Sequence, residues 1–242
     1  MILALETATL ACSAALCAAD GSAVAERVSL DGPAHSRLLL PFVHAIFAEA
    51  GAGWADVDTV AVGLGPGAFT GLRIGIATAR ALAQADGRAG LAGVSTLAAL
   101  ALALALAPEA SPGKRLVPLV DGRRREVFAA VFEADGGGVR QVGDVAVVPA
   151  DDLAVWLAAR GDVVTGGDGA ALYGELLPAS AQPAAGIVAP TAAMVGRAVA
   201  CGAPGLVRGP DAVLPLYGRA PDAKPRASVS RPVASPAAGG AS

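Results

Sequence analysis

The glycine-rich segment at residues 63–75 is the part of the sequence whose residue types best suit anion binding. It reads GLGPGAFTGLRIG, follows an apolar run and leads into a helical pattern. A strand that breaks into glycines before a helix leaves backbone N–H groups near a helix N-terminus, where an anion can bind. The segment lacks the Lys-Ser/Thr of a Walker A loop and the spacing of the dinucleotide fingerprint, and Pro66 removes one N–H donor. Gly65, Gly67 and Thr70 are therefore candidate anion-binding residues, without establishing a nucleotide site.

Two acidic residues end apolar strands in the two halves of the chain. Glu6 ends the first predicted strand, and Asp121 ends a similar strand roughly 115 residues later. This weak internal repeat predicts two lobes whose cleft holds both acids near the glycine segment. Such acids can hold a cation, but acids at strand ends are also ordinary turn formers. Thr7, Gly167 and Asp168 complete the predicted set of nucleotide or anion cleft residues.

Few other side chains are suited to catalysis. His35 and His44 are nine residues apart, so on one helix they face opposite sides and cannot share a metal ion. Cys12, Cys17 and Cys201 lack metal-ligand spacing, which favours reduced thiols in a cytosolic protein. On a strand, Cys12 and Cys17 would face opposite sides of the sheet. We therefore expect no metal site and no catalytic residue, and no serine–histidine–acid order can be assigned.

A stripe of small residues follows the glycine segment. Gly71, Gly75, Ala79 and Ala83 recur every four residues, so they share one face of the predicted helix. Such a face allows another element to approach closely. Two interpretations remain open: the stripe packs against the chain's own sheet, or it docks a helix of a partner. The apolar residues of the preceding helix would supply a second wall for a partner interface.

The composition limits the possible functions. The chain has 242 residues, of which 54% are apolar and 16% charged, with a net charge of −3. A protein that holds nucleic acid by itself is normally more basic, and the run Arg123–Arg125 favours a solvated turn. The stretch 89–107 approaches membrane length, but its alanines and its Gly93 and Ser95 favour a buried helix. No secretory signal pattern opens the sequence, so we expect a cytoplasmic protein without a membrane partner.

The hydrophobic pattern predicts an α/β protein. Strands are expected at 1–9, 12–19, 22–30, 57–63, 91–94, 116–121, 126–133, 137–148 and 162–165, and helices at 35–50, 71–85, 95–107, 150–159 and 191–200. The predicted division is a first lobe at 1–107, a linker at 108–114 and a second lobe at 115–219. Residues 220–242 are rich in Pro, Ala, Ser and Gly, which predicts a disordered tail.

Several segments resemble the bacterial TsaB (YeaZ) family. They are LALETAT at 3–9, His35-Ser36 with Leu39 and Pro41, the glycine segment, VSTL at 94–97, DGR at 121–123, EVF at 126–128 and PLYGR at 215–219. The resemblance spans roughly residues 1–220. It implies the ASKHA fold of actin, Hsp70 and sugar kinases, with two RNase H-like lobes that each contain a mixed sheet flanked by helices.

The resemblance also implies a non-catalytic role. TsaD, the catalytic paralogue of this family, transfers a threonylcarbamoyl group to N6 of the adenosine beside the tRNA anticodon, and it binds its metal through an HxxxH pair. Thr96 and Leu100 stand where those histidines would fall, and neither can replace imidazole as a ligand. Two departures from the family pattern are Glu6, where aspartate is commoner, and Ala79-Arg80-Ala81, where Ala-Lys-Gly is usual.

The resemblance therefore implies a dimerisation and scaffold subunit that pairs with a TsaD-like paralogue through the helices of its first lobe. It would help recruit a TsaE-like ATPase, form a homodimer when alone and contact tRNA through the complex. No intrinsic cofactor is expected, and ATP or ADP would bind at the assembled complex. The predicted interface residues are His35, Leu39, Phe42, Val43, Ile46, Gly71, Arg73, Gly75, Ala79 and Ala83. The alternatives are a metal-dependent threonylcarbamoyltransferase acting by itself and a small-molecule kinase of the same fold with ATP at 166–169.

Overall fold

The computed structural model describes residues 1–32 and 34–218, and it contains two mixed β-sheets. The predicted tail at 220–242 and Arg219 lie outside the described residues. The first sheet has the strand order β11-β5-β4-β1-β2-β3. Its strands are β1 (Ile2–Glu6), β2 (Cys12–Cys17), β3 (Ala23–Ser29), β4 (Thr59–Gly63), β5 (Gly90–Val94) and β11 (Val207–Arg208). Because β1 pairs parallel with β4 and antiparallel with β2, its carboxyl end lies beside the glycine segment that follows β4.

The second sheet repeats this arrangement. It has the strand order β10-β9-β6-β7-β8, with β6 parallel to β9 and antiparallel to β7. Its strands are β6 (Arg115–Arg123), β7 (Glu126–Asp135), β8 (Gly138–Pro149), β9 (Val163–Gly166) and β10 (Ala181–Pro183). The strands β1 and β6 thus occupy equivalent positions in the two sheets, as the internal repeat predicts. Glu6 and Asp121 accordingly lie near the carboxyl ends of these two strands.

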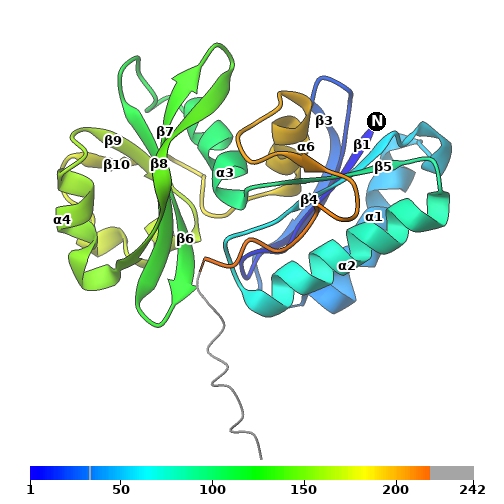
Figure 1. Ribbon diagram of the computed structural model, residues 1–242, viewed down its shortest axis with the longest axis horizontal. Helices are drawn as coiled ribbons and strands as arrows, with labels where there is room; N and C mark the ends of the chain where they lie inside the picture. Colours follow the sequence, from blue (N-terminus) through cyan, green and yellow to red (C-terminus); the bar gives the residue numbers. More distant parts are fainter. Residues whose placement is uncertain (33, 219–242) are drawn as a thin grey trace, which may run out of the picture.

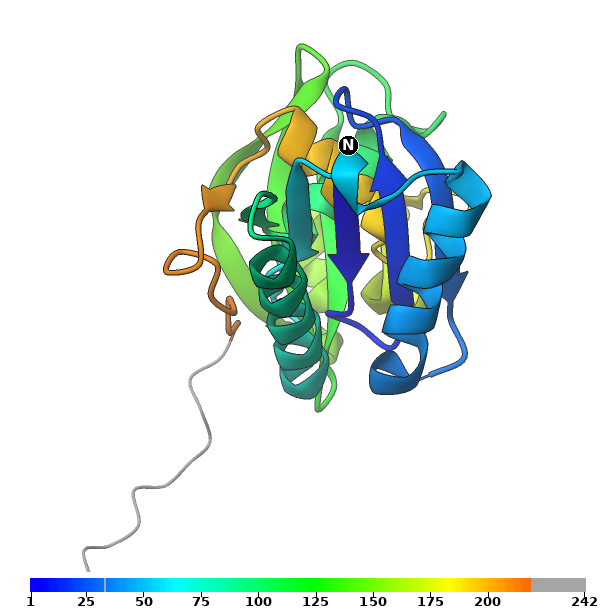
Figure 2. The same ribbon diagram turned by 90° about the vertical axis from the view of Figure 1, so that its right-hand side faces the viewer.

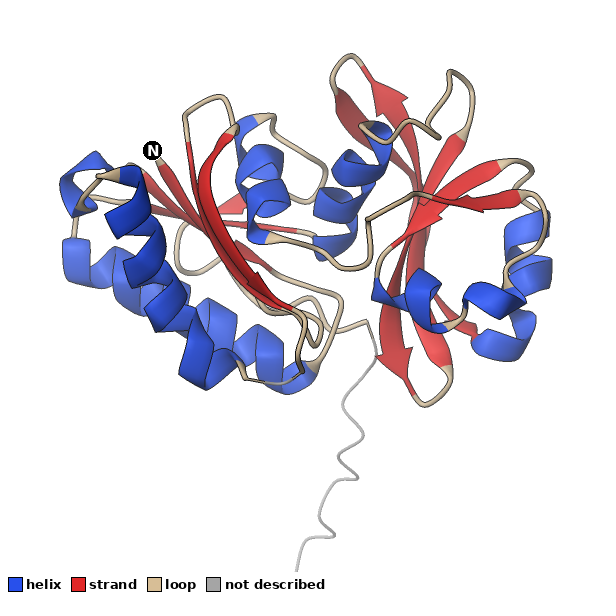
Figure 3. Ribbon diagram, turned by 180° about the vertical axis from the view of Figure 1, so that it is seen from behind, coloured by secondary structure: helices blue, strands red, loops and turns tan. Residues whose placement is uncertain are grey.

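Helices form three layers around the two sheets (Figure 1). The first sheet is covered on its outer face by α1 (His35–Ala50) and α2 (Phe69–Asp86), and the second by α4 (Leu153–Ala158) and α5 (Asp168–Leu172). Between the sheets lie α3 (Thr96–Ala105), which packs on β6 to β9, and α6 (Ala192–Ala200), which packs on β1 to β5. Short 3-10 turns occur at Trp54–Asp56, Ala150–Asp152 and Gly174–Leu176. Figure 3 shows the same succession of layers from behind.

The side chains of the strands alternate between two apolar cores. On β1, Leu3 and Leu5 pack outward beneath α1 and α2, whereas Ile2 and Ala4 pack inward toward α6. The two cysteines of β2 follow the same rule, since Cys12 belongs to the outer core and Cys17 to the inner one. Their expected placement on opposite faces is therefore confirmed.

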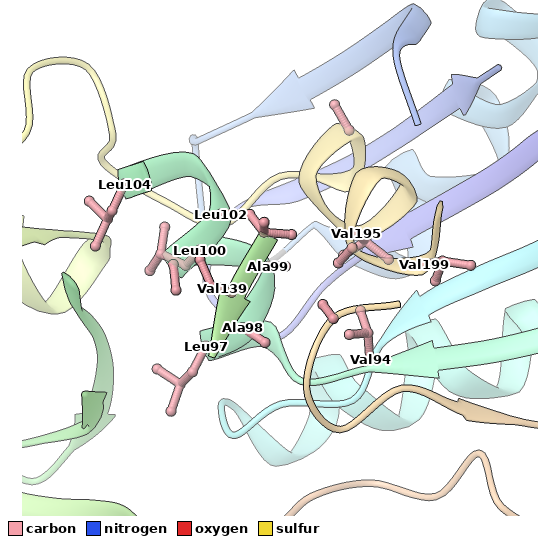
Figure 4. Close-up of a cluster of buried hydrophobic side chains, with 14 of the residues drawn as sticks. Val94, Leu97, Ala98, Ala99, Leu100, Leu102, Leu104, Val139, Val195 and Val199 are labelled. Carbon is pink, nitrogen blue, oxygen red and sulfur yellow. The ribbon is translucent and has the colours of Figure 1, made fainter. Parts of the chain in front are cut away.

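The inner core joins the two sheets. The sequence of α3, TLAALALALA, is apolar on every side, and a helix of this kind must be buried all round. Figure 4 shows Leu102 and Val195 between α3 and α6, whereas Leu97, Leu100 and Leu104 project from the opposite side of α3. This cluster continues from the first sheet into β6 and β7 of the second, so one core holds the two halves together.

The stretch 89–107 divides into β5 and the buried helix α3, as its composition favours. Across the described residues, no helix combines the length and the apolar composition that a bilayer crossing requires. The expected buried helix at this place is therefore confirmed.

The C-terminal part of the predicted second lobe belongs to the first half of the molecule. We expected all of 115–219 to form that lobe, but α6 packs on the first sheet and β11 pairs with β5. The segment that follows β10 therefore crosses back to the first half of the molecule. Periodicity predicts that a helix exists at 191–200, but it does not indicate which sheet covers the apolar face of that helix.

Candidate functional site

Glu6 is a fully buried carboxyl group at the end of β1, with 1% of its surface exposed. The Ala8 N–H donates to its Oε1 at 2.6 Å, and the Thr96 hydroxyl donates to its Oε2 at 2.9 Å. The side chain fills the space above Gly63, where an added Cβ would lie 2.0 Å from Oε2. Both carboxylate oxygens therefore have hydrogen-bond partners within the protein.

Burial raises the pKa of Glu6 from 4.5 to about 7. Hydrogen bonds from Ala8, Thr96 and Thr7 lower this pKa, but they do not offset the loss of hydration. The charge of Asp168, in the second half of the molecule, raises it further. With this pKa, the carboxyl group is expected to change its protonation near neutral pH.

The glycines of the 63–75 segment make room for the chain's own β1–β2 loop. A Cβ at Gly67 would lie 2.2 Å from the carbonyl oxygen of Ala8, and one at Gly71 would lie 2.1 Å from that of Thr7. A Cβ at Gly75 would lie 2.2 Å from Thr7 Oγ1. The Thr7 hydroxyl donates to the carbonyl of Gly71 at 2.9 Å. The loop after β1 thus occupies the space that a bound anion would need.

The backbone donors of the glycine segment are also used internally. The Gly65 N–H donates to Thr96 Oγ1 at 3.1 Å, and the Ala68 N–H donates to the carbonyl of Ala8 at 2.6 Å. Thr70 lies exposed in the first turn of α2. This geometry makes the segment a packing turn that begins α2, and it gives no support to an anion site there.

Most of the predicted interface residues face the interior. Gly71, Gly75, Ala79 and Ala83 are all buried, and the two alanines belong to the core between α2 and the first sheet. In α1, the buried members of the predicted set are His35, Leu39, Val43 and Ile46, with Phe42 half-buried against the same core. Of the predicted set only Arg73 is exposed. The small-residue stripe therefore packs against the chain's own sheet, because a four-residue spacing defines a face without defining its direction.

A different face of α1 and α2 is open to solvent. On α1 it contains Leu40, which is 55% exposed, and His44; on α2 it contains Ala77 and Ala81. Figure 2 shows the two helices side by side on the outer surface of the first sheet. The exposed His44 and the buried His35 lie on opposite faces of α1, as the spacing predicts. His35 Nε2 lies 3.1 Å from the carbonyl oxygen of Ala11, so this ring closes the packing around the β1–β2 loop.

A cleft of about 440 Å³ lies between the two halves. Its polar lining consists of Thr9, Asp121, Arg123 and Asp168. Four larger apolar side chains line it as well, namely Leu10, Leu30, Leu172 and Val188. The structure thus brings together Asp121 and Asp168, two members of the predicted cleft set, whereas Glu6, which the repeat places beside Asp121, is not among the lining residues.

The electrostatics of this cleft do not suit a phosphate. The Asp121 N–H donates to Asp168 Oδ1 at 3.1 Å, and Arg123 Nη1 lies 3.3 Å from Asp121 Oδ2. Burial raises the pKa of Asp168 to about 6, and the nearby charge of Asp121 contributes in the same direction. Two carboxyl groups against one guanidinium make the cleft acidic above that pH, which repels anions.

The glycines at 166–169 pack against the second sheet and α3. Gly167 has φ of 106°, and a Cβ there would lie 2.4 Å from the carbonyl oxygen of Leu119. A Cβ at Gly169 would lie 2.9 Å from the carbonyl carbon of the same residue. These glycines are therefore needed for close packing, and their arrangement provides no cradle for ATP.

Thr96 and Leu100 of α3 are part of the protein interior. Thr96 is tied to Glu6 and Gly65, and Leu100 is completely buried between the sheets. Within residues 1–32 and 34–218, no three His, Cys, Asp or Glu side chains are grouped so that they could hold a metal ion.

No sequence pattern predicted how the segment 207–218 lies against α2. Arg80 Nη2 donates to the carbonyls of Pro210 and Val213 at 2.7 and 2.8 Å. At the other end of the segment, the rings of Tyr217 and Phe69 stack with centroids 5.3 Å apart. In the sequence, this segment was distinguished by the PLYGR motif at 215–219, which supported the family resemblance. The motif did not indicate a contact with α2.

Known proteins with similar sequences fall into one group. Residues 29–162 match the family model described as TsaD: tRNA N6-adenosine threonylcarbamoyltransferase. An uncharacterized protein of Mycobacterium tuberculosis is 37% identical over 229 residues, which covers 93% of this chain and 95% of that protein. The tRNA threonylcarbamoyladenosine biosynthesis protein TsaB of Escherichia coli is 38% identical over 138 residues, 57% of each chain. The chain spans 58% of the length of a relative from Mycobacterium leprae, which is 36% identical over 96% of this chain.

A solved structure agrees with these matches. YeaZ from Pseudomonas aeruginosa has a TM-score of 0.70 and 34% identity, covering 89% of this chain and 98% of that one. This similarity and the family match confirm the expected ASKHA-type α/β fold, with two mixed sheets flanked by helices. The chain belongs to the TsaB (YeaZ) family.

Proposed function

We propose that this chain is a non-catalytic subunit of the system that forms threonylcarbamoyladenosine in tRNA, and that it acts in the cytoplasm. The name of the E. coli relative supports the pathway. The observation that carries the non-catalytic role is the placement of Thr96 and Leu100 in the core between the sheets. A metal-binding histidine pair at these positions would have to replace a buried hydroxyl bonded to Glu6 and a buried leucine.

The outer face of α1 and α2 is the proposed docking surface for a TsaD-like paralogue. Leu40 supplies exposed apolar area, and Ala77 and Ala81 allow close approach of a partner helix. The same face would form the homodimer when the chain is alone. The proposal further includes recruitment of a TsaE-like ATPase, with ATP or ADP bound by the assembled complex.

Substitutions on this face test the interface without disturbing the core. Leu40→Glu places a charge on the exposed surface of α1, and Ala81→Trp blocks close approach to α2. Val155→Glu is the matched control, because Val155 is 76% exposed on α4 at the far side of the second sheet. Gly75 and Ala79 are unsuitable test positions, since both are buried and bulky side chains there would disturb folding.

The measurement is the mass of the species formed when each purified variant is mixed with the TsaD-like paralogue of the same genome, read by light scattering. The wild-type chain and Val155→Glu should form a complex of the same mass, and Leu40→Glu and Ala81→Trp should remain separate from the paralogue. Equal complex formation by all four proteins would exclude this face as the docking surface.

A further inference from the structure

The segment 207–218 and α2 together form one flank of the first half of the molecule. The segment runs antiparallel to the helix: Tyr217 contacts Phe69 and Arg73 near the start of α2, and Pro210 contacts Arg80 two turns further on. Beyond this point, β11 pairs with β5. This arrangement is visible in Figure 1, where the C-terminal segment passes alongside α2.

An exposed stack of aromatic and guanidinium groups lies at one end of this flank. Phe69 and Tyr217 are 49% and 41% exposed, and their rings are inclined by only 28°. The guanidinium carbon of Arg73 lies 3.9 Å from the centre of the Phe69 ring, and Arg73 Nε–H donates to the Tyr217 hydroxyl at 3.3 Å. Aromatic rings and arginine planes that stay exposed in this way are the groups on which unpaired RNA bases stack.

A basic groove lies at the other end of the flank. It has a volume of about 790 Å³, and its polar lining comprises Arg80, Gln84 and Arg208. The side chain of Arg208 is exposed, and its guanidinium makes no hydrogen bond or ion pair within the described part of the chain, whereas its backbone pairs with Ala92 of β5. Arg80 Nε is buried without an acceptor there, although its Nη2 holds the segment in place. A free guanidinium beside a groove is a site for a phosphate group.

The two sites are arranged along one line. The stretch of α2 from Arg73 to Gln84 is about 17 Å long at 1.5 Å per residue, which suits a few nucleotides of an extended strand. Segments 69–86 and 207–218 contain three arginines and two aspartates, so this flank is positive in a chain whose net charge is −3. Stacking groups at one end and a phosphate-binding arginine at the other are what a single strand requires.

We propose that this flank binds a single-stranded segment of RNA, with a base on the Phe69–Tyr217 stack and a backbone phosphate at Arg208. The proposal adds a direct RNA contact to the proposed function, which routes tRNA through the complex. It concerns a surface of the isolated chain, so its test does not depend on the TsaD-like paralogue. Failure of RNA binding and failure of complex formation are therefore separate results.

The test is fluorescence anisotropy of a labelled single-stranded oligoadenylate titrated with the purified full chain at low salt, repeated over a salt series. Phe69→Ala should weaken binding about 5- to 150-fold, the range measured for loss of one base–aromatic stack. Arg208→Ala should lower the slope of log K against log salt by about 0.7, because one phosphate contact is lost. Circular dichroism establishes that each variant is folded.

Two matched controls keep the result specific. Arg37→Ala removes another exposed arginine of the first half, and Trp54→Ala removes another exposed aromatic residue, whose ring lies tilted at 50° against that of Phe47. Both should bind the oligonucleotide like the wild type. The proposal is overturned if Phe69→Ala and Arg208→Ala also bind like the wild type. It is overturned as well if inorganic phosphate or AMP competes as effectively as unlabelled RNA. It is also overturned if Phe69→Ala and Arg208→Ala weaken the complex with the TsaD-like paralogue but leave RNA binding unchanged.

Discussion

The buried carboxyl group of Glu6 predicts a stability that falls as the pH rises. Its pKa lies at about 7 in the folded chain, against 4.5 when the group is hydrated. Since one pKa unit corresponds to about 1.4 kcal/mol, the ionised form of this residue costs the folded state about 3 kcal/mol. Desolvation is the main cause, so the cost follows from the position of Glu6 between β4 and α3.

The sign follows from proton binding. The folded chain holds the proton more tightly than the unfolded chain, so it binds more protons between pH 4.5 and about 7. The contribution of Glu6 to stability is therefore full below pH 4.5 and is lost as the pH rises through about 7. Asp168, whose pKa is raised to about 6, acts in the same direction but completes its change at lower pH.

Urea unfolding over a pH series measures this effect. The free energy of unfolding of the wild type should fall between about pH 5 and about pH 8, and Glu6→Gln should remove the part of the fall that lies above about pH 6. Glu175→Gln, which changes an exposed carboxyl group in the second half of the molecule, should leave the slope of the curve unchanged. A wild-type stability that is flat from about pH 6 to about pH 8, or an unchanged slope in Glu6→Gln, would refute the reasoning.

Two further predictions concern packing. Gly75→Val should lower the free energy of unfolding by about 3 kcal/mol or more, because its Cβ would meet Thr7 Oγ1 at 2.2 Å. Ala77→Val, on the exposed face of the same helix, should cost less than about 1 kcal/mol; equal losses in thermal or urea unfolding would contradict the inward orientation of the stripe. In a thiol titration at neutral pH, the native chain should expose one reactive group, Cys201. Burial raises the pKa of Cys12 to about 11 and keeps both thiols of β2 inaccessible, so rapid reaction of more than one thiol would show that this packing is wrong.

Local patterns predict much of the fold. The apolar spacing of α1 gives its bounds, and the left-handed Gly51 that follows ends the helix as a C-terminal glycine does. The strands of both sheets appear where β-favouring residues alternate or cluster between turns. Their ends differ from the predicted ones by a few residues, because pairing with a neighbouring strand decides where a strand stops.

Other parts of the fold depend on contacts between distant segments. The strand β11 has two residues and exists only because it pairs with β5, so it carries no pattern of its own. The same holds for α5, whose five residues include a glycine that packs on β6. The side of the molecule covered by α6 is likewise decided by the inner core.

The candidate site shows the same division. The internal repeat predicted that Glu6 and Asp121 share a cleft, but the structure buries Glu6 and places Asp121 in the cleft with Asp168 instead. The glycines of 63–75 indicated that another group packs closely against this segment, but they did not indicate whether that group is a ligand or a part of the chain. The β1–β2 loop lies against these glycines and gives no support to an anion site, and the residues of the small-residue stripe are buried.

The measurement that tests the central claim most directly is threonylcarbamoyl transfer to unmodified tRNA in a reconstituted reaction. It contains threonylcarbamoyl-adenylate, a divalent cation and ATP, with the TsaD-like and TsaE-like proteins of the same genome added or omitted. The account predicts no product from this chain alone, and product that depends on this chain when the paralogue is present. Modified tRNA formed by the isolated chain would contradict the account and support a transferase that acts by itself. Transfer by the partners at full rate without this chain would contradict it equally.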